Sequence, residues 1–464
     1  MSESLTVAVA GATGFIGRRL CALLRDQGHK VIGIGRSVED GVQQDGVLWR
    51  RADLFSLLRC ETACAGADVV YYLVHSMLPS ARLTQARFED MDLILADNVA
   101  RACAKQGVKR IVYLGGLVPD GSDISRHLAS RREVEDALGA HGVPVTTLRA
   151  GLVIGPHGSS FQILERLVEH LPAMVLPRWT RGEMQPIALD DVLRLLVKAA
   201  DSRLIGSGPT DVGGPEVVTY RRLIEMTAEA MGKRRLLIQV PIGTPMLSSL
   251  WVSAVTGQPR QLTGPLVESL DHTMVAADRS FQEASGIKGR SVSEALRQAL
   301  SGETDAPEVT VPRGSSPRAY QWVRSVQRMR LPPGQTADWA AHTYLGWLPR
   351  FLWPMLRVEG DADGTAAIRI RGTSLTLLEL CYSPERSTPD RALLYVTGGM
   401  LAVVQSPVRG RLELRTVLDG RTLIAAVHDF EPYLPWFIYV ATQAQAHLYV
   451  MARFRRYLAR LQSK

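Results

Sequence analysis

The chain has 464 residues and a formal net charge of +8 at pH 7. This length exceeds what one hydrophobic core ordinarily supports, so we expect two domains. A mildly basic balance fits a phosphate-bearing cofactor, an anionic membrane surface or nucleic acid, but the sequence holds no block of Lys and Arg and no nucleic-acid-binding motif, which argues against a nucleic-acid partner.

The cysteines and the start of the chain indicate a cellular compartment. The five cysteines are odd in number and lack paired metal-ligand spacing, so we expect reduced thiols and no metal site. They are Cys21, Cys60, Cys64, Cys103 and Cys381. No charged-then-apolar leader precedes the first predicted strand, and no apolar run is long enough to span a bilayer. We therefore expect a cytoplasmic protein.

The first motif is a glycine turn in residues 5–20, LTVAVAGATGFIGRRL. Val7–Ala10 predicts a buried strand, and Gly11, Gly14 and Gly17 then lead into a helix with GxxGxxG spacing. Amide groups at a helix N-terminus attract phosphate, and glycines let a pyrophosphate approach the backbone. The alternative is a tight turn without a ligand. The predicted cofactor contacts here are Gly11, Thr13, Gly14, Phe15, Ile16 and Gly17.

The second predicted strand, residues 29–35, ends at Arg36 and Ser37, with no acid before Glu39. In a dinucleotide-binding fold, an acid at this point binds the ribose 2′-OH and favours NAD, whereas an arginine pairs with the 2′-phosphate and favours NADP. Arg36 and Ser37 therefore predict a site for NADP(H), with NAD as the alternative cofactor. The other interpretation is that Arg36 is a solvated surface residue.

Further strands alternate with helices, and this order predicts a doubly wound, Rossmann-like parallel α/β sheet. Leu73, near the end of the fourth strand, is a further predicted cofactor contact. His75 follows the same strand, where the chain passes the nicotinamide side in this fold, and is an acid/base candidate. Its alternative role is that of a hydrogen-bonded loop histidine. The strands are 47–54, 67–76, 108–116 and 143–149, and the helices include 88–102 and 131–138.

Residues 301–318 are polar and rich in Pro, Gly and Ser, which is typical of a linker. This stretch separates a predicted first domain, 1–300, from a second, 319–464. The second domain reads as strands separated by turns, and a helix from Pro435 to about Leu461 closes the chain. We expect a smaller α+β domain of helix-grip type. Its predicted elements are a helix at 337–348 and strands at 366–370, 375–382, 392–396, 411–418 and 421–428.

The closing helix has an apolar start, 436–440, and a basic end. Cations at a helix C-terminus complement the helix dipole, which is one sufficient explanation. The other is a peripheral contact between a basic amphipathic helix and an anionic membrane. The basic residues are Arg453, Arg455, Arg456, Arg460 and Lys464.

Several strings together carry a family resemblance: GATGFIG, YLGGLVPDG and HLASRREVE in the first half, and RLELR, AVHDFEP and LPWFIYVATQAQAH in the second. They resemble the YbjT-like proteins, which are NAD(P)-binding, NmrA-like, atypical short-chain dehydrogenase/reductase proteins fused to a DUF2867 domain. The resemblance covers nearly the whole chain. It implies an NAD(P)-binding first domain, a DUF2867-like second domain and a position for Asp53 near the adenine of the cofactor.

Well-known short-chain reductases place a Tyr and, four residues later, a Lys on one helix face, where the Tyr exchanges the substrate proton. In this sequence His127 falls at the Tyr position and Arg131 at the Lys position. One interpretation is an oxidoreductase for a small hydrophobic carbonyl or quinone-like substrate, with His127 as proton donor and Arg131 on the ribose or substrate. A second is a non-catalytic NADP(H) sensor or scaffold. In a third, both residues lie at a solvated helix start.

Overall fold

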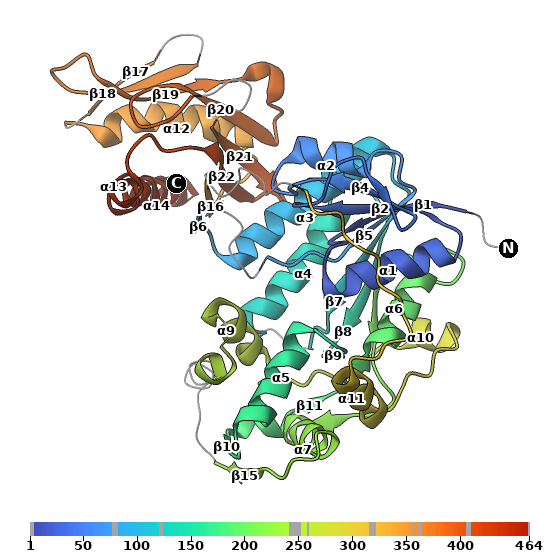
Figure 1. Cartoon of the computed structure of the whole chain (residues 1–464). Helices are drawn as coiled ribbons and strands as arrows, with labels where there is room; N and C mark the ends of the chain where they lie inside the picture. Colours follow the sequence, from blue (N-terminus) through green and yellow to red (C-terminus); the bar gives the residue numbers. More distant parts are fainter. Residues whose placement is uncertain are drawn as a thin grey trace. The chain divides into compact units, whose positions relative to one another are not determined.

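The computed structural model describes residues 4–76, 82–119, 124–240, 252–257, 259–314, 322–354, 356–360, 364–404 and 410–462. The chain divides into two compact units, one made of residues 1–78 and 95–315 and the other of residues 79–94 and 316–464 (Figure 1). The division near residue 315 falls inside the predicted linker. Residues 79–94, which the sequence placed in the first domain, group with the second unit. None of the helices in the described ranges is long and apolar enough to cross a bilayer.

The first unit contains an eight-stranded sheet in the order β13-β8-β7-β5-β1-β2-β4-β3. All its neighbouring strands are parallel except β3 and β4, which confirms the predicted doubly wound, Rossmann-like sheet. The order reverses direction between β1 and β5. The strands are β1 Thr6–Ala10, β2 Lys30–Gly35, β3 Gln43–Gln44, β4 Val47–Arg51, β5 Val69–Tyr72, β7 Arg110–Gly116, β8 Val145–Ala150 and β13 Gly208–Val212.

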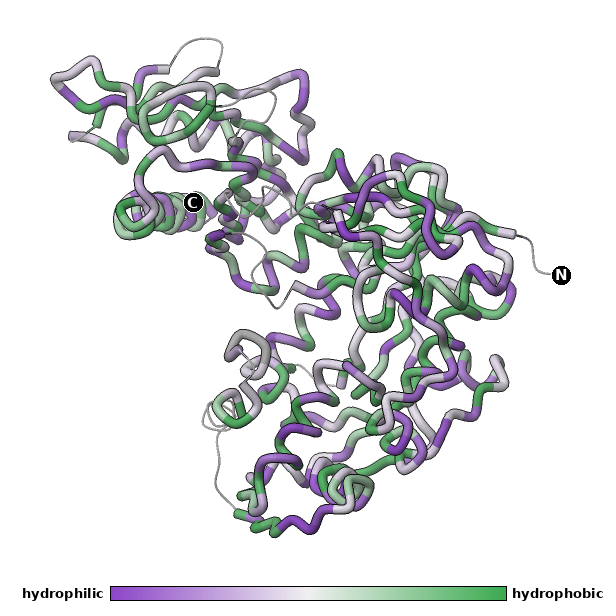
Figure 2. Tube along the Cα trace, viewed as in Figure 1, coloured by the Kyte–Doolittle hydropathy of each residue, from purple (hydrophilic) through white to green (hydrophobic). Residues whose placement is uncertain are grey.

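Helices cover both faces of this sheet, because its central strands are apolar on both sides. Val7, Val9 and Val112 are fully buried, and the hydrophobic residues of the strands lie inside the unit (Figure 2). The helices are α1 Phe15–Asp26, α2 Leu57–Cys64, α3 Phe88–Gln106, α4 Arg126–Gly139, α5 Ser159–His170, α6 Leu189–Lys198, α7 Tyr220–Ala230, α9 Arg260–Ser269, α10 Ser280–Ala284 and α11 Val292–Ser301. Short two-stranded sheets lie in the segments between these helices. They pair β9 Val153–Ile154 with β12 Ile187–Ala188, β10 Ala173–Leu176 with β15 Leu236–Gln239, and β11 Glu183–Met184 with β14 Val218–Thr219.

Helix α4 begins at Arg126, earlier than the predicted start at Arg131. The reason is a cap: the Ser125 hydroxyl accepts a hydrogen bond from the Leu128 amide at 3.3 Å. A capping serine accepts a hydrogen bond from an amide that has no acceptor within the helix. The helix therefore begins directly after Ser125, nearer the N-terminus than predicted. His127 consequently lies in the first turn of the helix.

The second unit contains an eight-stranded sheet in the order β17-β18-β19-β20-β21-β22-β16-β6. Its pairings are antiparallel apart from the parallel pair of β6 and β16, so the unit is the expected α+β domain. Strands β6, β16 and β17 have no counterpart in the predicted elements. The strands are β6 Leu83–Gln85, β16 Val323–Arg330, β17 Leu356–Gly360, β18 Thr365–Ile370, β19 Thr376–Tyr382, β20 Arg391–Gly398, β21 Arg411–Val417 and β22 Thr422–Phe430.

One face of this sheet packs against a helix layer made of α12 Ala337–Leu352, α13 Trp436–Ala441 and α14 Gln443–Gln462. The prediction of a single closing helix was wrong, because Thr442 separates α13 from α14 with φ −122° and ψ −78°. Its hydroxyl donates to the Ile438 carbonyl at 2.6 Å, the back-bonding that bends helices at Ser and Thr.

The opposite face of β20, β21 and β22 carries a buried group of charges. Glu413 accepts two hydrogen bonds from Arg391, each of 3.0 Å, and a third from Arg415 Nε at 2.7 Å. His428 Nε2 lies 3.5 Å from the same carboxylate. Burial by itself would raise the pKa of Glu413, but Arg415, His428 and Arg391 outweigh it and hold that pKa well below its usual range.

We predict that Glu413→Gln destabilises the protein by about 3–5 kcal/mol, because it leaves the buried Arg415 and the partly buried Arg391 without their counter-charge. The matched control is Glu359→Gln. Glu359 also pairs with two arginines, Arg357 and Arg369, each at 2.9 Å, but its side chain is 34% exposed, and we expect a cost below about 1 kcal/mol. Urea unfolding of both variants is the measurement. Equal losses of unfolding free energy in the two variants would show that burial does not determine how much the ion pairs of Glu413 contribute to stability.

Candidate functional site

The predicted site residues follow successive parallel strands of the first unit. Gly11–Gly17 follows β1, Arg36 follows β2, Asp53 follows β4, and Leu73 and His75 follow β5. Carboxyl ends of parallel strands meet at one edge of a sheet, and ligands bind there where the strand order reverses. In this sheet the reversal lies between β1 and β5.

The glycine turn exposes backbone amides at the start of α1. Gly11 has φ +91°, a conformation that side chains disfavour, and its carbonyl accepts the Gly14 amide at 2.9 Å. Gly14 then occupies the N-cap position of α1, where no side chain caps the helix. The first amides of α1 are therefore available to an external acceptor such as a phosphate.

The third glycine lets α1 lie directly on this turn. A Cβ atom at Gly17 would lie 2.2 Å from the Gly11 carbonyl oxygen, which no real side chain tolerates. A Cβ atom at Gly11 would lie 3.1 Å from the Leu73 carbonyl oxygen, so the turn also contacts the end of β5. These close approaches form a cradle that only glycine leaves open.

Of the other predicted cofactor contacts in the turn, one is exposed to solvent and two are partly buried. Thr13 is exposed, and Ile16 is partly buried on α1. The Phe15 ring packs against Gly155 and Gly158, where an added Cβ atom would lie 3.1 Å from the ring. Phe15 thus anchors the first turn of α1 against the segment that follows β9.

The ends of β2 and β4 place the residues assigned to the adenosine part of the cofactor. Arg36 and Ser37 are exposed, and a Cβ atom at Gly35 would lie 2.7 Å from Thr13 Cγ2, so the end of β2 abuts the glycine turn. The Ser37 carbonyl accepts the Gly314 amide at 3.0 Å. Asp53 is partly buried, and its Oδ1 accepts the Phe55 amide at 3.2 Å.

His75 and His127 come together, although they follow different strands. Their ring centroids are 5.4 Å apart and their planes are inclined by 49°. His127 Nδ1 lies 3.1 Å from the Ser269 hydroxyl at the end of α9, which lies 2.9 Å from the Ser125 hydroxyl. The Ser269 hydroxyl also donates to the Pro265 carbonyl at 3.0 Å. Ser269 is a site residue that sequence reasoning missed, and no local motif marks it.

His127 is held in its neutral form. Burial, the neighbouring His75 and the Arg131 guanidinium all disfavour the positively charged form of the His127 ring and lower the pKa of His127 to about 3. At neutral pH the ring therefore carries one proton, and its hydrogen-bond partners decide which nitrogen holds it.

Arg131 lies one helical turn after His127 and is fixed against β7. Its Nη2 donates to the Leu114 carbonyl at 2.6 Å, and its guanidinium lies 5.1 Å from the centre of the Tyr113 ring. The Tyr113 hydroxyl donates to the Arg131 carbonyl at 3.3 Å. Arg131 Nη1 is buried and has no hydrogen-bond partner in the described part of the chain. A buried donor of this kind fits an oxygen atom of a bound molecule.

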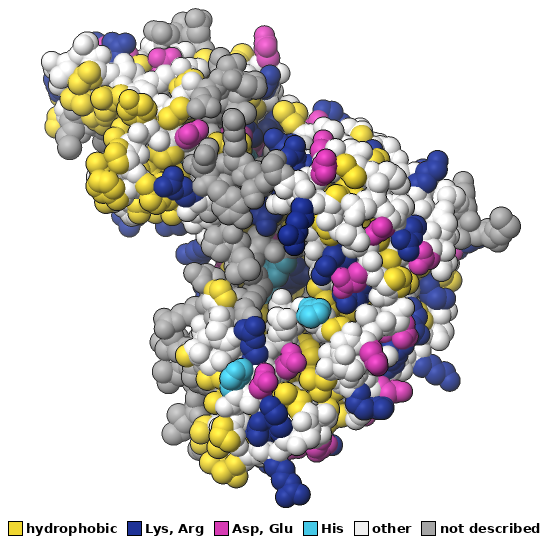
Figure 3. Space-filling view, viewed as in Figure 1, with side chains coloured by type: hydrophobic (Ala, Val, Ile, Leu, Met, Phe, Trp, Pro, Cys, Tyr) yellow, Lys and Arg dark blue, Asp and Glu magenta, His cyan; other side chains and the backbone are white. Residues whose placement is uncertain are grey.

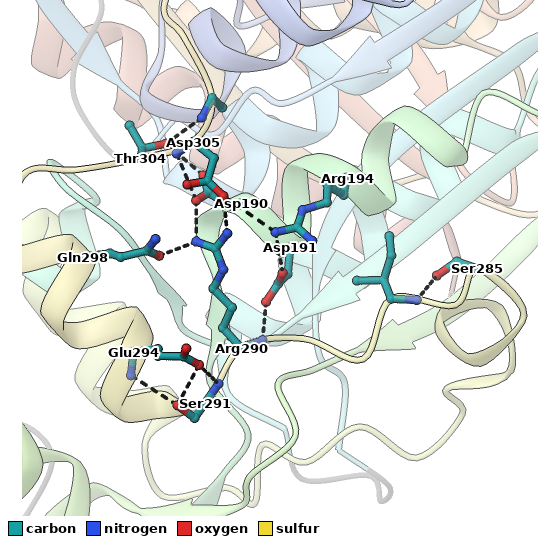
Figure 4. A network of polar contacts seen from close by, with 12 residues as sticks. Asp190, Asp191, Arg194, Ser285, Arg290, Ser291, Glu294, Gln298, Thr304 and Asp305 are labelled. Carbon is teal, nitrogen blue, oxygen red and sulfur yellow. Dashed lines mark hydrogen bonds and ion pairs between the residues drawn. The ribbon is translucent and has the colours of Figure 1, made fainter.

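A separate network of charges, drawn in Figure 4, fixes the segment that leaves the first unit. Asp190 Oδ2, at the start of α6, accepts Arg290 Nη1 at 2.8 Å, and Asp190 Oδ1 accepts the Thr304 hydroxyl at 2.8 Å (Figure 4). Asp191 accepts the Arg290 amide at 2.7 Å, and Asp305 forms an ion pair with Arg290. A nearby surface pocket of about 460 Å³ shares no lining residue with the predicted site. The network is therefore structural support rather than part of the cofactor site.

Comparisons with known proteins show similarity over part of the first unit. Residues 7–206 match the NAD dependent epimerase/dehydratase family. An uncharacterized protein of Mycobacterium tuberculosis is 31% identical over 245 residues, which cover 52% of this chain and 25% of that protein. The 2-alkyl-3-oxoalkanoate reductase of Stenotrophomonas maltophilia is 29% identical over 186 residues, which cover 36% of this chain and 55% of the reductase. The chain thus spans about a quarter of the mycobacterial protein and about half of the reductase.

Among solved structures, a nucleoside-diphosphate-sugar epimerase from Staphylococcus aureus aligns with a TM-score of 0.51 and 14% identity, covering 63% of this chain and all of that chain. At this identity the likeness shows the fold alone. The resemblance of the second half to DUF2867 proteins stays a prediction. The N-terminal region, residues 7–206, is similar to the NAD dependent epimerase/dehydratase family, and its parallel sheet is Rossmann-like.

Proposed function

We propose that the first unit binds NADP(H) and reduces a small hydrophobic carbonyl or quinone-like compound. The observation that carries this proposal is the meeting of His75, His127 and Arg131 beside the carboxyl ends of β5 and β7. In a doubly wound fold this edge, next to the strand-order reversal, is where a dinucleotide presents its reactive end.

The residues present fit a dinucleotide. The cradle of Gly11, Gly14 and Gly17 and the uncapped amides of α1 would hold the pyrophosphate, and the exposed Arg36 would pair with a 2′-phosphate. The buried Nη1 of Arg131 supports a hydrogen bond to a ribose or substrate oxygen. When bound, the nicotinamide supplies a hydride.

His127 acts in this proposal as a neutral hydrogen-bond donor rather than as an imidazolium acid. With a pKa of about 3 it carries no positive charge at neutral pH. The Ser269 hydroxyl has one proton: when it donates to Nδ1 instead of the Pro265 carbonyl, the ring proton resides on Nε2, which can donate to a substrate carbonyl oxygen. Such a donor stabilises the negative charge that develops on that oxygen as the hydride adds to the carbonyl carbon, and solvent water then protonates the oxygen to give the alcohol.

The surroundings favour a hydrophobic substrate. Leu117, which follows β7, and Leu128, next to His127 on α4, are both 2% exposed and belong to one apolar cluster with Ile154 and Phe161. A relative that covers part of the same region is named as a reductase of 2-alkyl-3-oxoalkanoates, which carry a ketone beside alkyl chains. The name of this relative supports a carbonyl compound with alkyl chains.

A second function, a non-catalytic NADP(H) sensor, has its own supporting observation. One guanidinium nitrogen of Arg131 donates to the Leu114 carbonyl, which fixes the side chain to β7. Position 127 holds a histidine and not a tyrosine. A site that binds the cofactor rigidly but lacks the usual tyrosine acid could report its redox state without turnover.

Calorimetric titration with NADPH and NADH tests the cofactor. We predict that Arg36→Glu weakens NADPH binding by at least about tenfold and leaves NADH binding nearly unchanged, because only NADPH carries the 2′-phosphate. The control is Arg59→Glu, an equal charge change at an exposed position on α2. Equal losses for both cofactors would show that Arg36 does not recognise the phosphate, and no binding of either would refute the cofactor site.

Steady-state reduction of ketone and quinone panels tests the chemistry. We predict that His127→Phe lowers kcat by about 100-fold to 1000-fold and leaves NADPH affinity unchanged, since it removes the donor to the developing oxyanion. His170→Phe, at an exposed position, is the control. If wild-type protein binds NADPH tightly but reduces no panel member, the sensor function is favoured; full activity in His127→Phe would exclude His127 and leave His75 as the candidate.

The pH dependence separates the two possible roles of His127. A neutral donor with a pKa of about 3 predicts that kcat does not change with His127 titration between pH 6 and 8. An imidazolium acid would instead lose activity as pH rises through its pKa. A fall in kcat centred near pH 6.5 that His127→Gln abolishes would therefore contradict the neutral donor.

A further inference from the structure

The outer face of α14 carries a stripe of cations with one aromatic ring. Tyr449, Arg453, Arg456 and Arg460 are exposed and spaced at i, i+4, i+7 and i+11, so they lie on one side of the helix. Met451, Phe454 and Leu458, on the other side, are at most 2% exposed and pack in the core of the second unit. The stripe is therefore not needed to hold the helix on its sheet.

Large aromatic side chains are exposed on the same helix layer. Tyr449 is 57% exposed, Trp353 at the end of α12 is 62% exposed, and Phe437 on α13 is 74% exposed. The Tyr449 ring lies 5.9 Å from the Phe351 ring, which connects the end of α12 to the middle of α14. Figure 3 shows hydrophobic side chains gathering on the surface of the second unit. Exposure of several large rings by one layer is unusual unless they meet a partner.

Cations accompany these rings, and acids are absent from the sequence of α13 and α14. The Arg371 guanidinium lies 3.8 Å from the centre of the Trp353 ring, and that of Arg453 lies 5.7 Å from the Tyr449 ring. The sequence from residue 432 to residue 464 contains no Asp or Glu. This part of the surface is thus positive and aromatic at once.

We propose that this aromatic-arginine face, formed by Trp353, Phe437, Tyr449 and the arginines of the α14 stripe, binds the surface of a bilayer that contains anionic lipid. Aromatic rings with a polar edge favour the boundary between headgroups and acyl chains. Arginines beside them gain from the negative potential of anionic headgroups. The apolar side of α14 stays in the core of the unit, so the rings alone enter the boundary and the helix lies along the surface.

Charge complementarity selects this occupant over a second copy of the chain. Two identical faces in contact would bring the Arg453, Arg456 and Arg460 stripes of both copies together without any acid from residues 432–464 to neutralise them. An anionic bilayer supplies the missing negative charge over a wide, flat area.

Co-sedimentation of the full chain with vesicles tests the proposal. We expect binding to vesicles of phosphatidylcholine with phosphatidylglycerol, weaker binding to phosphatidylcholine alone, and loss of binding at high salt. The triple variant Arg453→Gln/Arg456→Gln/Arg460→Gln should lower the partition coefficient for the anionic vesicles by at least about tenfold. Phe437→Ser should lower it at constant charge, which separates ring insertion from electrostatics alone.

The matched control is Arg59→Gln/Arg234→Gln/Arg297→Gln, which removes the same charge from exposed positions of the first unit. Circular dichroism and thermal melting confirm that each variant is folded. The proposal is overturned if wild-type protein fails to bind the anionic vesicles at low salt, binds both vesicle types equally, or loses binding equally in the control triple. A dimer in light scattering that Phe437→Ser dissociates, without vesicle binding, would assign the face to a second copy instead.

Discussion

The contact between Gly17 and the Gly11 carbonyl is the constraint on which the first unit depends. A Cβ atom there would lie 2.2 Å from that oxygen, so α1 can lie on the turn only because Gly17 has no side chain. This approach aims the uncapped amides of α1 at the edge where the strand order reverses. The same turn contacts Leu73 at the end of β5, so one steric condition places the glycine cradle beside the strand that leads to His75.

The chemistry of the site follows from what surrounds His127. Burial, His75 and Arg131 together make the positively charged imidazolium of His127 unfavourable. His127 therefore does not replace the missing tyrosine as a charged acid. A neutral ring whose Nδ1 faces Ser269 is a donor of fixed orientation. Arg131, anchored to Leu114, supplies the neighbouring positive charge that a substrate oxygen or ribose would meet. In the proposed function, this arrangement polarises a substrate oxygen and transfers no proton from a cation.

Alternation of side chains along the strands of the second unit places apolar residues on one face of the sheet and buried charged residues on the other. Along β21, Leu412 and Leu414 face the helix layer, whereas Glu413 and Arg415 face the other side and form a buried charged group. The helix layer then presents its own outer surface, where rings and arginines replace the mixed charges of an ordinary solvent face. Stability of the sheet and the proposed membrane contact of the helix layer therefore rest on different residues, so surface substitutions on α14 can be made without disturbing Glu413.

The sequence alone determined the features that repeat locally. Apolar runs and the glycine spacing predicted the strand, turn and helix at residues 5–20 and the parallel sheet, because backbone conformation there follows from neighbouring residues. Tertiary structure decided what depends on distant residues. The second unit includes residues 79–94, whose strand β6 pairs with β16. Ser269 meets His127 across 142 positions, an encounter that no local pattern encodes. Each of these outcomes is set by packing and hydrogen bonds between segments that are brought together only after the chain folds.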